Sequence, residues 1–410
     1  MTELEAYPND ATFVSIDIAM QTFDVLVSPH SKKRYRLKIT NDRAGHDQLI
    51  RDLEAIGKPV VVGFEATGNY HRTIAWRLLD AGFTTHLISS VALARTREAM
   101  HNSWDKNDPK DAQVMLHLLQ TGQVQRYIDP MMNNTNDWQE LSKTHEIISK
   151  NKTETLHRLK THYWPLYFPE IDRFRHGSRK EWFFKFLYQF PIPASITALS
   201  KETFAAQAAP LMGRKVRKNA LIGDIYATAQ ESSALPVALD SAAVIMYRIV
   251  IMQMCRLIQS RDKIEQQANE LLGGNQDFVR LQQIPGIGPI HAMTILAEAG
   301  NLRRFGHHRQ FLKYCGFDLA THQSGQFRGQ SKISKYGNAR LRKAFWMAGQ
   351  VAVKMNENSF KDKYLRYTAK DRDDRDLNRK AYTAVAAKVA RVAYSVIKHE
   401  TDYRPFYGAR

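Results

Sequence analysis

Apolar and polar positions alternate in short runs along the first ninety residues. Two such runs lie in FVSIDIAMQTFDVLV (13–27) around a polar turn, and a third is RYRLKIT (34–40). Alternation with a period of two predicts half-buried strands, and the short spacing predicts hairpins between them. They are followed by a helical pattern, an apolar strand, a second helical pattern and a further strand, at about 43–56, 60–65, 70–81 and 83–89.

Three hairpin strands followed by alternating helices and strands predict an α/β layer with the element order of ribonuclease H-like and RuvC-like domains. We assign this domain to residues 1–128. The remainder is predicted to be all-α: a central helical and coiled-coil section (129–277), a helical domain (278–365), and a charged linker with a C-terminal helix (366–410). The predicted fold class is therefore α/β plus all-α.

The central section contains two apolar features. Eleven aromatic residues lie between 163 and 190, which favours a compact helical core over a surface that stacks bases. Between 239 and 272, positions spaced alternately by four and three form a coiled-coil stripe, whose partner is either a second protomer or an earlier helix at about 137–162. The stripe consists of Ala243, Tyr247, Val250, Met254, Leu257, Arg261, Ile264, Ala268 and Leu271.

Composition is that of a globular protein that binds a polyanion. Of 410 residues, 43% are hydrophobic, and the 59 Lys+Arg exceed the 41 Asp+Glu by 18, which favours a nucleic-acid partner. Cys255 and Cys315 lack the spacing of a disulfide scaffold or a zinc site, so a reducing cytoplasm is expected. The chain has no run of 18 apolar residues and no apolar leader, so we expect neither a membrane span nor secretion.

Four carboxylates occur where strand and helix ends would bring them together. Asp17 interrupts an apolar strand, Glu65 ends another, and Asp108 and Asp111 share one face of a helix that begins near Pro109. Singly, each acid has an ordinary structural explanation, such as a helix cap. Together they would repel one another strongly unless a hard divalent cation bound them. We therefore expect Mg²⁺ or Mn²⁺, as a pair that clamps a phosphodiester.

Residues 281–300, LQQIPGIGPIHAMTILAEAG, match a helix-hairpin-helix whose turn amides hold a phosphate; an ordinary glycine turn is the alternative. Residues 302–344 then contain ten Lys and Arg against one acid, Asp318, which is half the net charge in about a tenth of the chain. This imbalance predicts a phosphate-binding surface. The predicted nucleic-acid-binding residues are Gly286, Gly288, Arg303, Arg304, Arg328, Lys332, Lys335, Asn338, Arg340 and Arg342.

The basic segment also contains three serines among glycines and bases: Ser324, Ser331 and Ser334. A serine hydroxyl binds phosphate, or attacks phosphorus when a metal or a base helps it lose its proton. The residues alone leave the choice between these roles open.

These motifs in combination resemble the IS-one-ten insertion-sequence transposases, with the eleven-eleven group and the Piv-type invertases as close relatives. The resemblance covers about 12–128 and 278–355. It implies a RuvC-like domain whose metal-binding tetrad is Asp17, Glu65, Asp108 and Asp111. It further implies a catalytic serine that attacks the phosphodiester and forms a covalent phosphoserine link. That serine falls on Ser324, and Ser331 is the alternative.

The resemblance also implies partners. They are donor and target DNA, a guide RNA encoded by the element that pairs with both, and a dimer that assembles to a tetramer, in which two protomers build each composite site. The expected location is the bacterial cytoplasm, at the nucleoid and away from membranes. We expect an RNA-guided transposase or recombinase. The alternatives are a RuvC-like metal-dependent nuclease that uses water, a protein-only site-specific DNA invertase, and a helix-hairpin-helix protein that only binds nucleic acid.

Overall fold

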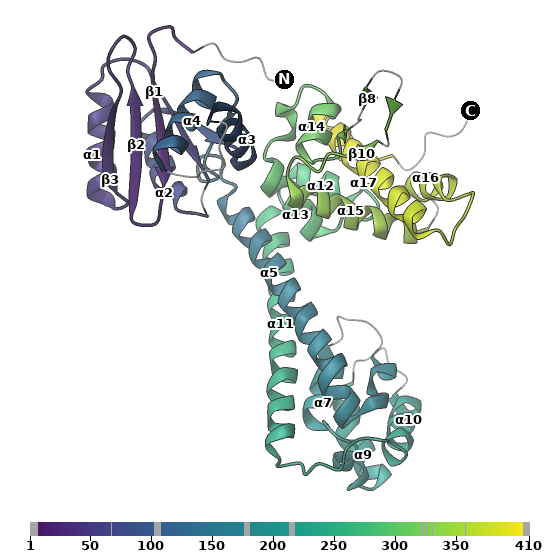
Figure 1. Ribbon diagram of the computed structural model, residues 1–410. Coiled ribbons are helices and arrows are strands. Elements are labelled where there is room, and N and C mark those ends of the chain that lie inside the picture. The colour runs from purple at the N-terminus through teal and green to yellow at the C-terminus, as the bar shows by residue number, and fades with distance from the viewer. Residues whose placement is uncertain are drawn as a thin grey trace. The chain divides into compact units, whose positions relative to one another are not determined.

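The chain forms two compact units, residues 1–136 and 137–410, which we call the α/β unit and the helical unit. Figure 1 shows the computed structural model. The residues it describes are 7–66, 68–101, 108–175, 181–212, 218–320, 323–324, 327–329, 331–356 and 358–404.

The α/β unit contains one mixed sheet in the order β3-β2-β1-β4-β5-β6. The sequence predicts five of its strands: β1 (Thr12–Ile18), β2 (Thr22–Ser28), β3 (Tyr35–Thr40), β4 (Val60–Glu65) and β5 (Thr84–Ile88). β1, β2 and β3 are joined in antiparallel order, whereas β4 and β5 continue the sheet parallel to β1. The short strand β6 (Gln125–Arg126) pairs antiparallel with β5 at the edge, and the sequence pattern misses it.

Helices cover both faces of this sheet. The residues Val14, Ile16 and Phe64 pack in one core with Leu49 of α1 (Arg43–Glu54) and Ile74 of α2 (His71–Asp80). The alternate strand positions therefore face the other side, where α4 (Asp108–Gln120) packs on the sheet and α3 (Ser90–His101) packs on α4. This second face carries the acidic residues of interest, because strand side chains alternate between faces.

The aromatic cluster of the helical unit is a core. Nine of its eleven aromatics are buried, and they pack with residues of α7, α9, α10 and α11. The elements around it are α5 (Asn136–Arg158), a π-helical turn (Leu159–Tyr163), α6 (Trp164–Tyr167), a 3-10 turn (Pro169–Phe174), α7 (Glu181–Gln189), α8 (Ala194–Thr197), α9 (Lys201–Ala208), a 3-10 turn (Ala209–Leu211), α10 (Lys218–Gln230) and α11 (Ala242–Leu272). The interpretation of this segment as a compact core is confirmed.

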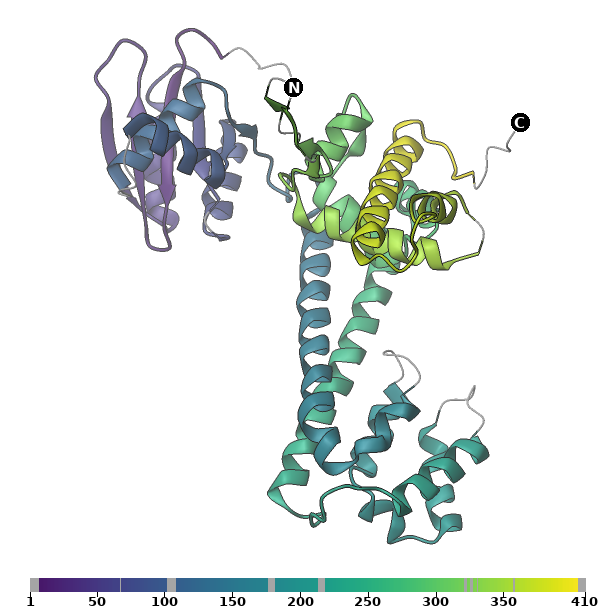
Figure 2. The same ribbon diagram turned by 45° about the vertical axis from the view of Figure 1, so that its right-hand side comes forward.

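The stripe on α11 packs against elements of the same chain, namely α5 and the turn after it. Figures 1 and 2 show the two helices side by side, Arg261 donates to His145 of α5 at 3.3 Å, and Tyr163 stacks on Tyr247. Five of the nine predicted stripe positions are buried, whereas Val244, Ile258 and Leu272 are buried in place of their neighbours Ala243, Leu257 and Leu271. A straight helix with 3.6 residues per turn drifts away from a strict 3.5-residue repeat.

By length and composition alone, α11 would also be able to cross a membrane. A core helix meets the same test, and α11 buries nine residues inside the helical unit. The other side of its first half leaves Ile245, Met246 and Ile249 about half exposed.

The rest of the helical unit shares one core. Its elements are α12 (Gln276–Gln282), α13 (Pro289–Ala299), a 3-10 turn (Leu302–Arg304), α14 (His308–Tyr314), the two-residue strands β7 (Leu319–Ala320), β8 (Gln323–Ser324), β9 (Phe327–Arg328) and β10 (Lys332–Ile333), then α15 (Ala339–Lys354), α16 (Ser359–Tyr367) and α17 (Arg375–Lys398). The segment read as a charged linker contributes the first turns of α17, whose N-cap is Asp374. Val385, Ala386 and Val389 of α17 pack in the same core as α13 and α15.

Candidate active site

The sheet brings Asp17 and Glu65 next to each other. In the parallel pairing of β1 with β4, Ser15 is opposite Gly63 and Ile16 is opposite Phe64, so the next position pairs Asp17 with Glu65. Both carboxylates stand at the carboxyl ends of parallel strands, which is the edge where α/β sheets bind ligands.

Two contacts show that both side chains lie on the α4 face. Ser15, two residues before Asp17, donates its hydroxyl to the carbonyl of Ala112 in α4 at 2.9 Å. A Cβ added to Gly63, two residues before Glu65, would come within 3.1 Å of Leu119 in α4. Side chains two residues apart on a strand share a face, so α4 covers the side of the sheet that carries both acids.

Asp111 belongs to this face through α4. It lies beside Ala112, which anchors α4 to β1, and it is 4% exposed. Arg97 of α3 donates to its carboxylate at 2.5 Å and is itself mostly buried. Sequence reasoning missed Arg97, because no spacing rule connects a base on one helix with an acid on the next.

Asp108 is the first residue of α4, one turn before Asp111, as the Pro109 pattern predicts. Its side chain lies outside the described part of the structure. The topology therefore brings Asp17, Glu65 and Asp111 to one edge and one face of the sheet, and it starts α4 with the fourth acid.

A further acid, Asp24 of β2, was not predicted. In the antiparallel pairing of β1 with β2 it lies directly opposite Asp17. Like charges that face each other across strands repel. A register count made on the predicted hairpin would have found it, because both strands were expected.

The oxygen donors of this edge suit a hard divalent cation in their chemistry. Among the described side chains, a set that leaves out Asp108, no group of three or more His, Cys, Asp or Glu lies close enough to hold a metal ion. Arg97 already neutralises Asp111, so a cation that binds Asp111 would have to displace Arg97 from it.

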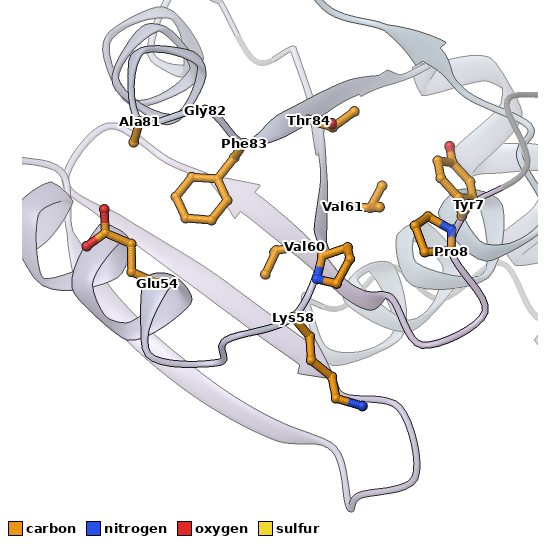
Figure 3. A pocket seen from close by; sticks show the side chains of 11 residues that line it. Tyr7, Pro8, Glu54, Lys58, Val60, Val61, Ala81, Gly82, Phe83 and Thr84 are labelled. Atoms are coloured by element: carbon orange, nitrogen blue, oxygen red, sulfur yellow. The ribbon is translucent and has the colours of Figure 1, made fainter.

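A cavity of about 580 Å³ lies at the opposite ends of the same strands. Figure 3 shows Phe83 reaching into it beside Val60, with Tyr7 and Pro8 on its other side. Its lining comes from the first residues of β4 and β5, whereas Asp17 and Glu65 occupy the carboxyl ends. This cavity is therefore separate from the acidic edge.

Ser324 lies near the tip of a narrow β-ribbon in the helical unit. β7 pairs with β10, and further along the ribbon Ser324 of β8 pairs with Phe327 of β9. Arg328 is the last residue of β9, and the side chains of Ser324 and Arg328 lie outside the described set. Ser331 is exposed, whereas Ser334 is partly buried and its amide donates to the carbonyl of Asp318 at 2.7 Å.

The PGIG segment joins α12 to α13 by a short turn, as predicted. Gly286 has a φ of +87°, and an added Cβ would come within 2.0 Å of the carbonyl of Ala348 in α15. This glycine is therefore required for packing. Gly288 caps α13 without a side chain and has open space beside it, so a phosphate has access to the first turn of α13.

Two of the predicted phosphate-binding arginines are already paired with acids within the helical unit. Arg303 donates twice to Asp277 and once to Glu400, at 2.6 to 2.9 Å. Arg340 lies 2.7 Å from Glu298 and 3.0 Å from Glu146.

The remaining predicted residues divide into two groups. Arg342 donates to backbone carbonyls, Arg304 covers the rings of Phe305 and Tyr314, and Asn338 caps α15. Lys332 and Lys335 are exposed. Of these residues, the exposed lysines are therefore the ones whose side chains are accessible to a polyanion without the loss of one of these internal contacts.

Both units contain a segment that matches a known transposase family. Residues 14–168 match a transposase family model, the DEDD transposases of IS110, and residues 279–365 match the transposase IS116/IS110/IS902 family. The chain belongs to the IS110 family of insertion-sequence transposases. The first match covers the strands and α4 that carry the acids, and the second covers the ribbon that carries Ser324.

Two relatives of this transposase family are similar over part of their length. A probable family 20 transposase of Pseudomonas aeruginosa is 32% identical over 145 residues, which is 35% of this chain and 42% of that protein. A transposase for insertion sequence element IS1111A of Coxiella burnetii is 29% identical over 140 residues, 34% of this chain and 38% of that protein. The matched part thus spans about two fifths of each relative.

Proposed function

We propose that this protein is the transposase of an insertion sequence, and that it cuts and rejoins DNA. The observation that carries the proposal is the placement of Asp17, Glu65 and Asp111 on one face of the sheet edge, in a chain whose other unit carries Ser324 on a β-ribbon. The strand order, with three antiparallel strands followed by parallel ones, supports a ribonuclease H-like, RuvC-like domain.

In the proposed reaction, the hydroxyl of Ser324 attacks a DNA phosphorus. A serine–phosphate bond forms, a DNA phosphorus–oxygen bond breaks, and the released DNA hydroxyl takes up a proton. A hydroxyl of another strand then attacks the phosphoserine, which restores the serine and joins the strands. Because each step exchanges one ester for another, no external energy source is needed.

The carboxylates of Asp17, Glu65, Asp108 and Asp111 are proposed to hold Mg²⁺ or Mn²⁺. Such an ion lowers the charge at the phosphate and helps a hydroxyl lose its proton. The position of Asp24 directly opposite Asp17 supports a bound cation, because a cation lowers the repulsion between facing carboxylates. Arg97 supplies the positive charge at Asp111, and a metal ion held by Asp111 would take over that role.

The proposal includes the partners of the reaction: donor and target DNA, a guide RNA encoded by the element, and a homodimer that assembles to a tetramer in the bacterial cytoplasm. The α11 stripe faces α5 of its own chain. A dimer through this helix would therefore use its other side, where Ile245, Met246 and Ile249 are exposed. The exposed Lys332 and Lys335 are proposed to contact phosphates, with Gly288 offering amides of the first turn of α13.

The test combines variants with a strand-exchange assay. Purified protein is incubated with Mg²⁺, RNA transcribed from the sequence that flanks the coding frame, and donor and target DNA. Ser324→Ala should abolish both the covalent adduct and exchange, while Ser331→Ala, the matched control, should retain both. Exchange at the normal rate by Ser324→Ala would refute the assignment.

A second candidate is a RuvC-like nuclease in which water attacks the phosphate. It is favoured by one observation, namely that all four acids belong to the α/β unit, which lacks Ser324. In that case Ser324→Ala still nicks DNA and Asp17→Asn does not. The same assay therefore separates the two reactions.

A further inference from the structure

Four bases on α16 and α17 form a cluster that lies outside the basic segment 302–344. Lys363 and Arg366 are on α16, and Lys388 and Arg391 are on α17. The two helices pack against each other, as Figure 2 shows at the C-terminal end of the chain. Lys388 fixes their contact, because its ammonium donates to the carbonyl of Ser359 at 2.7 Å and lies 5.4 Å from the ring of Phe360.

The positive charges of this cluster interact with one another. Burial, followed by the charges of Arg391 and Arg366, lowers the pKa of Lys363 below its ordinary value. Burial and then Lys363, Arg366 and Arg391 lower the pKa of Lys388, and Asp362 is the acid that opposes them. Burial, and then the charges of His307 and Arg391, lower the pKa of His308 at the start of α14.

No described carboxylate forms an ion pair with any of the four bases. The one further hydrogen bond in the cluster goes from Arg366 to the backbone carbonyl of Asp362, at 3.4 Å. Arg340 shows the opposite situation in the same unit, because Glu146 and Glu298 neutralise it. The fold thus pairs its basic residues at one place and leaves four like charges together at another.

A cluster of unmatched cations is a binding site for a polyanion, since an external anion relieves the repulsion that the fold leaves in place. Two of the four bases are arginines, whose planar guanidinium groups bind phosphate oxygens in pairs. Exposed Arg391 and Arg366 flank the half-buried Lys363, so the cluster presents several charges on one rigid helix pair. Successive phosphates of a nucleic-acid backbone match such an array better than a single small anion does.

We propose, on the basis of the function proposed above, that the face formed by Lys363, Arg366, Lys388 and Arg391 binds the phosphate backbone of duplex DNA. The contact is independent of base sequence and adds to the contacts of the basic segment. Three of these four bases lie outside both segments that match transposase families, residues 14–168 and 279–365. The C-terminal helix therefore serves both as a wall of the core and as a DNA-binding element.

The test is duplex DNA binding by the full-length protein, measured by fluorescence anisotropy over a series of salt concentrations without divalent metal. The double variant Lys363→Gln, Arg391→Gln should weaken binding of a mixed-sequence duplex by about 10- to 100-fold at 0.1 M salt. It should also reduce the slope of log affinity against log salt by about two, one for each lost phosphate contact. The matched control is Arg256→Gln, Lys263→Gln, which removes two exposed charges from α11 of the same unit.

Thermal unfolding separates binding from folding. Because removal of a repelling charge relieves the cluster, Lys363→Gln alone should unfold at the same temperature as the parent or higher. A merely structural role for Lys363 would instead lower the unfolding temperature.

Three results would overturn the proposal. The first is a double variant with unchanged affinity and salt slope, and the second is a control that weakens binding equally. The third is a loss confined to a structured RNA of the same length, which would assign the face to RNA. A parent protein that binds no DNA at all contradicts the proposed function itself, so the two failures are distinguishable.

Discussion

The acidic edge of the α/β unit and the basic segment of the helical unit differ in how their charges are matched. At the acidic edge, Asp17 faces Asp24 across the strands and adjoins Glu65, and the nearby Asp111 has Arg97 as its counter-charge. In the basic segment, Arg303 and Arg340 are each paired with two acids. The edge therefore gathers acids from several strands and a helix, an arrangement that suits a metal ion, whereas Arg303 and Arg340 of the basic segment hold the fold together. Local charge counts do not distinguish these cases, but pairing does.

The largest expected effect is on catalysis at the acidic edge. Asp17→Asn should reduce DNA cleavage by about three to four orders of magnitude, because the loss of a proposed metal ligand would remove several kcal/mol of transition-state stabilisation. The measurement is the rate of strand cleavage in Mg²⁺. DNA affinity should stay within about twofold of the parent, and Asp10→Asn, an acid of the same unit that is ion-paired to Lys58, should cleave normally. Normal cleavage by Asp17→Asn would contradict a catalytic role for the acidic edge.

The next largest expected effect is on stability, and it concerns Asp129, a buried acid of the same unit. Asp129 is 1% exposed; burial acts to raise its pKa, but hydrogen bonds from Arg72, the amide of Met131 and Tyr127 outweigh it and lower the pKa. Asp129→Asn should lower the free energy of unfolding by about 4 kcal/mol at neutral pH. The loss should be complete above pH 4 and should shrink as the pH falls through the lowered pKa of the folded state.

Urea unfolding at several pH values measures this difference. Glu146→Gln in the helical unit is the comparison, because the pKa of Glu146 is lowered by Lys343 first, yet the side chain is 38% exposed. Its loss should be about 1 kcal/mol or less. A pH-independent deficit for Asp129→Asn would show that the ion pair with Arg72 is not the cause.

Arg97 connects the structural and functional roles of the acidic edge. Arg97→Gln leaves buried Asp111 without its partner, so the α/β unit should lose about 3 kcal/mol of stability in the absence of metal. Added Mn²⁺ should then stabilise the variant more than the parent, because no side chain competes for Asp111. Thermal unfolding with and without Mn²⁺ measures both effects, with Arg95→Gln, a more exposed position on the same helix, as the control. Equal stabilisation by Mn²⁺ in all three proteins would exclude the competition.

The smallest effect tests the basic segment. Arg340→Gln should lower the stability of the helical unit by about 2 kcal/mol, since it joins Ser142 and Glu146 of α5 to Glu298 of α13. Lys332→Gln should leave stability unchanged and weaken DNA binding by several-fold, because its side chain is exposed on β10. Thermal unfolding and anisotropy on the two variants compare these roles. An Arg340→Gln variant as stable as the parent would contradict the structural role of Arg340.

The sequence predicts most of the α/β unit because its signals are local. Alternation defines β1, β2 and β3, and the apolar run defines β4. The parallel direction of β4 relative to β1 follows from the two hairpins and from α1, which connects β3 to β4. The edge strand β6 has two residues and too little pattern to be recognised. The same holds for the four short strands that build the ribbon around Ser324, which depend on pairing rather than on alternation.

The sequence predicts those site residues whose position depends on a single helix or strand. Asp17 and Glu65 follow from strand ends, and Asp111 follows from the start of α4. Arg97 and the partners of Arg303 and Arg340 depend on contacts between distant segments, which no local pattern encodes. For the same reason the sequence pattern does not predict the basic cluster of α16 and α17, because its residues are interleaved with acids and apolar residues along the chain.

The most direct test of the central claim is to locate the covalent bond between protein and DNA. A reaction stopped by denaturation and digested with trypsin and nuclease separates the three candidate serines, because cleavage after Lys313, Arg328 and Lys332 places Ser324, Ser331 and Ser334 in different peptides. We predict a nucleotide attached to Ser324 in the 314–328 peptide, formed by the parent protein and absent from Asp17→Asn. Cleaved DNA with no adduct, or an adduct on another peptide, would contradict the account.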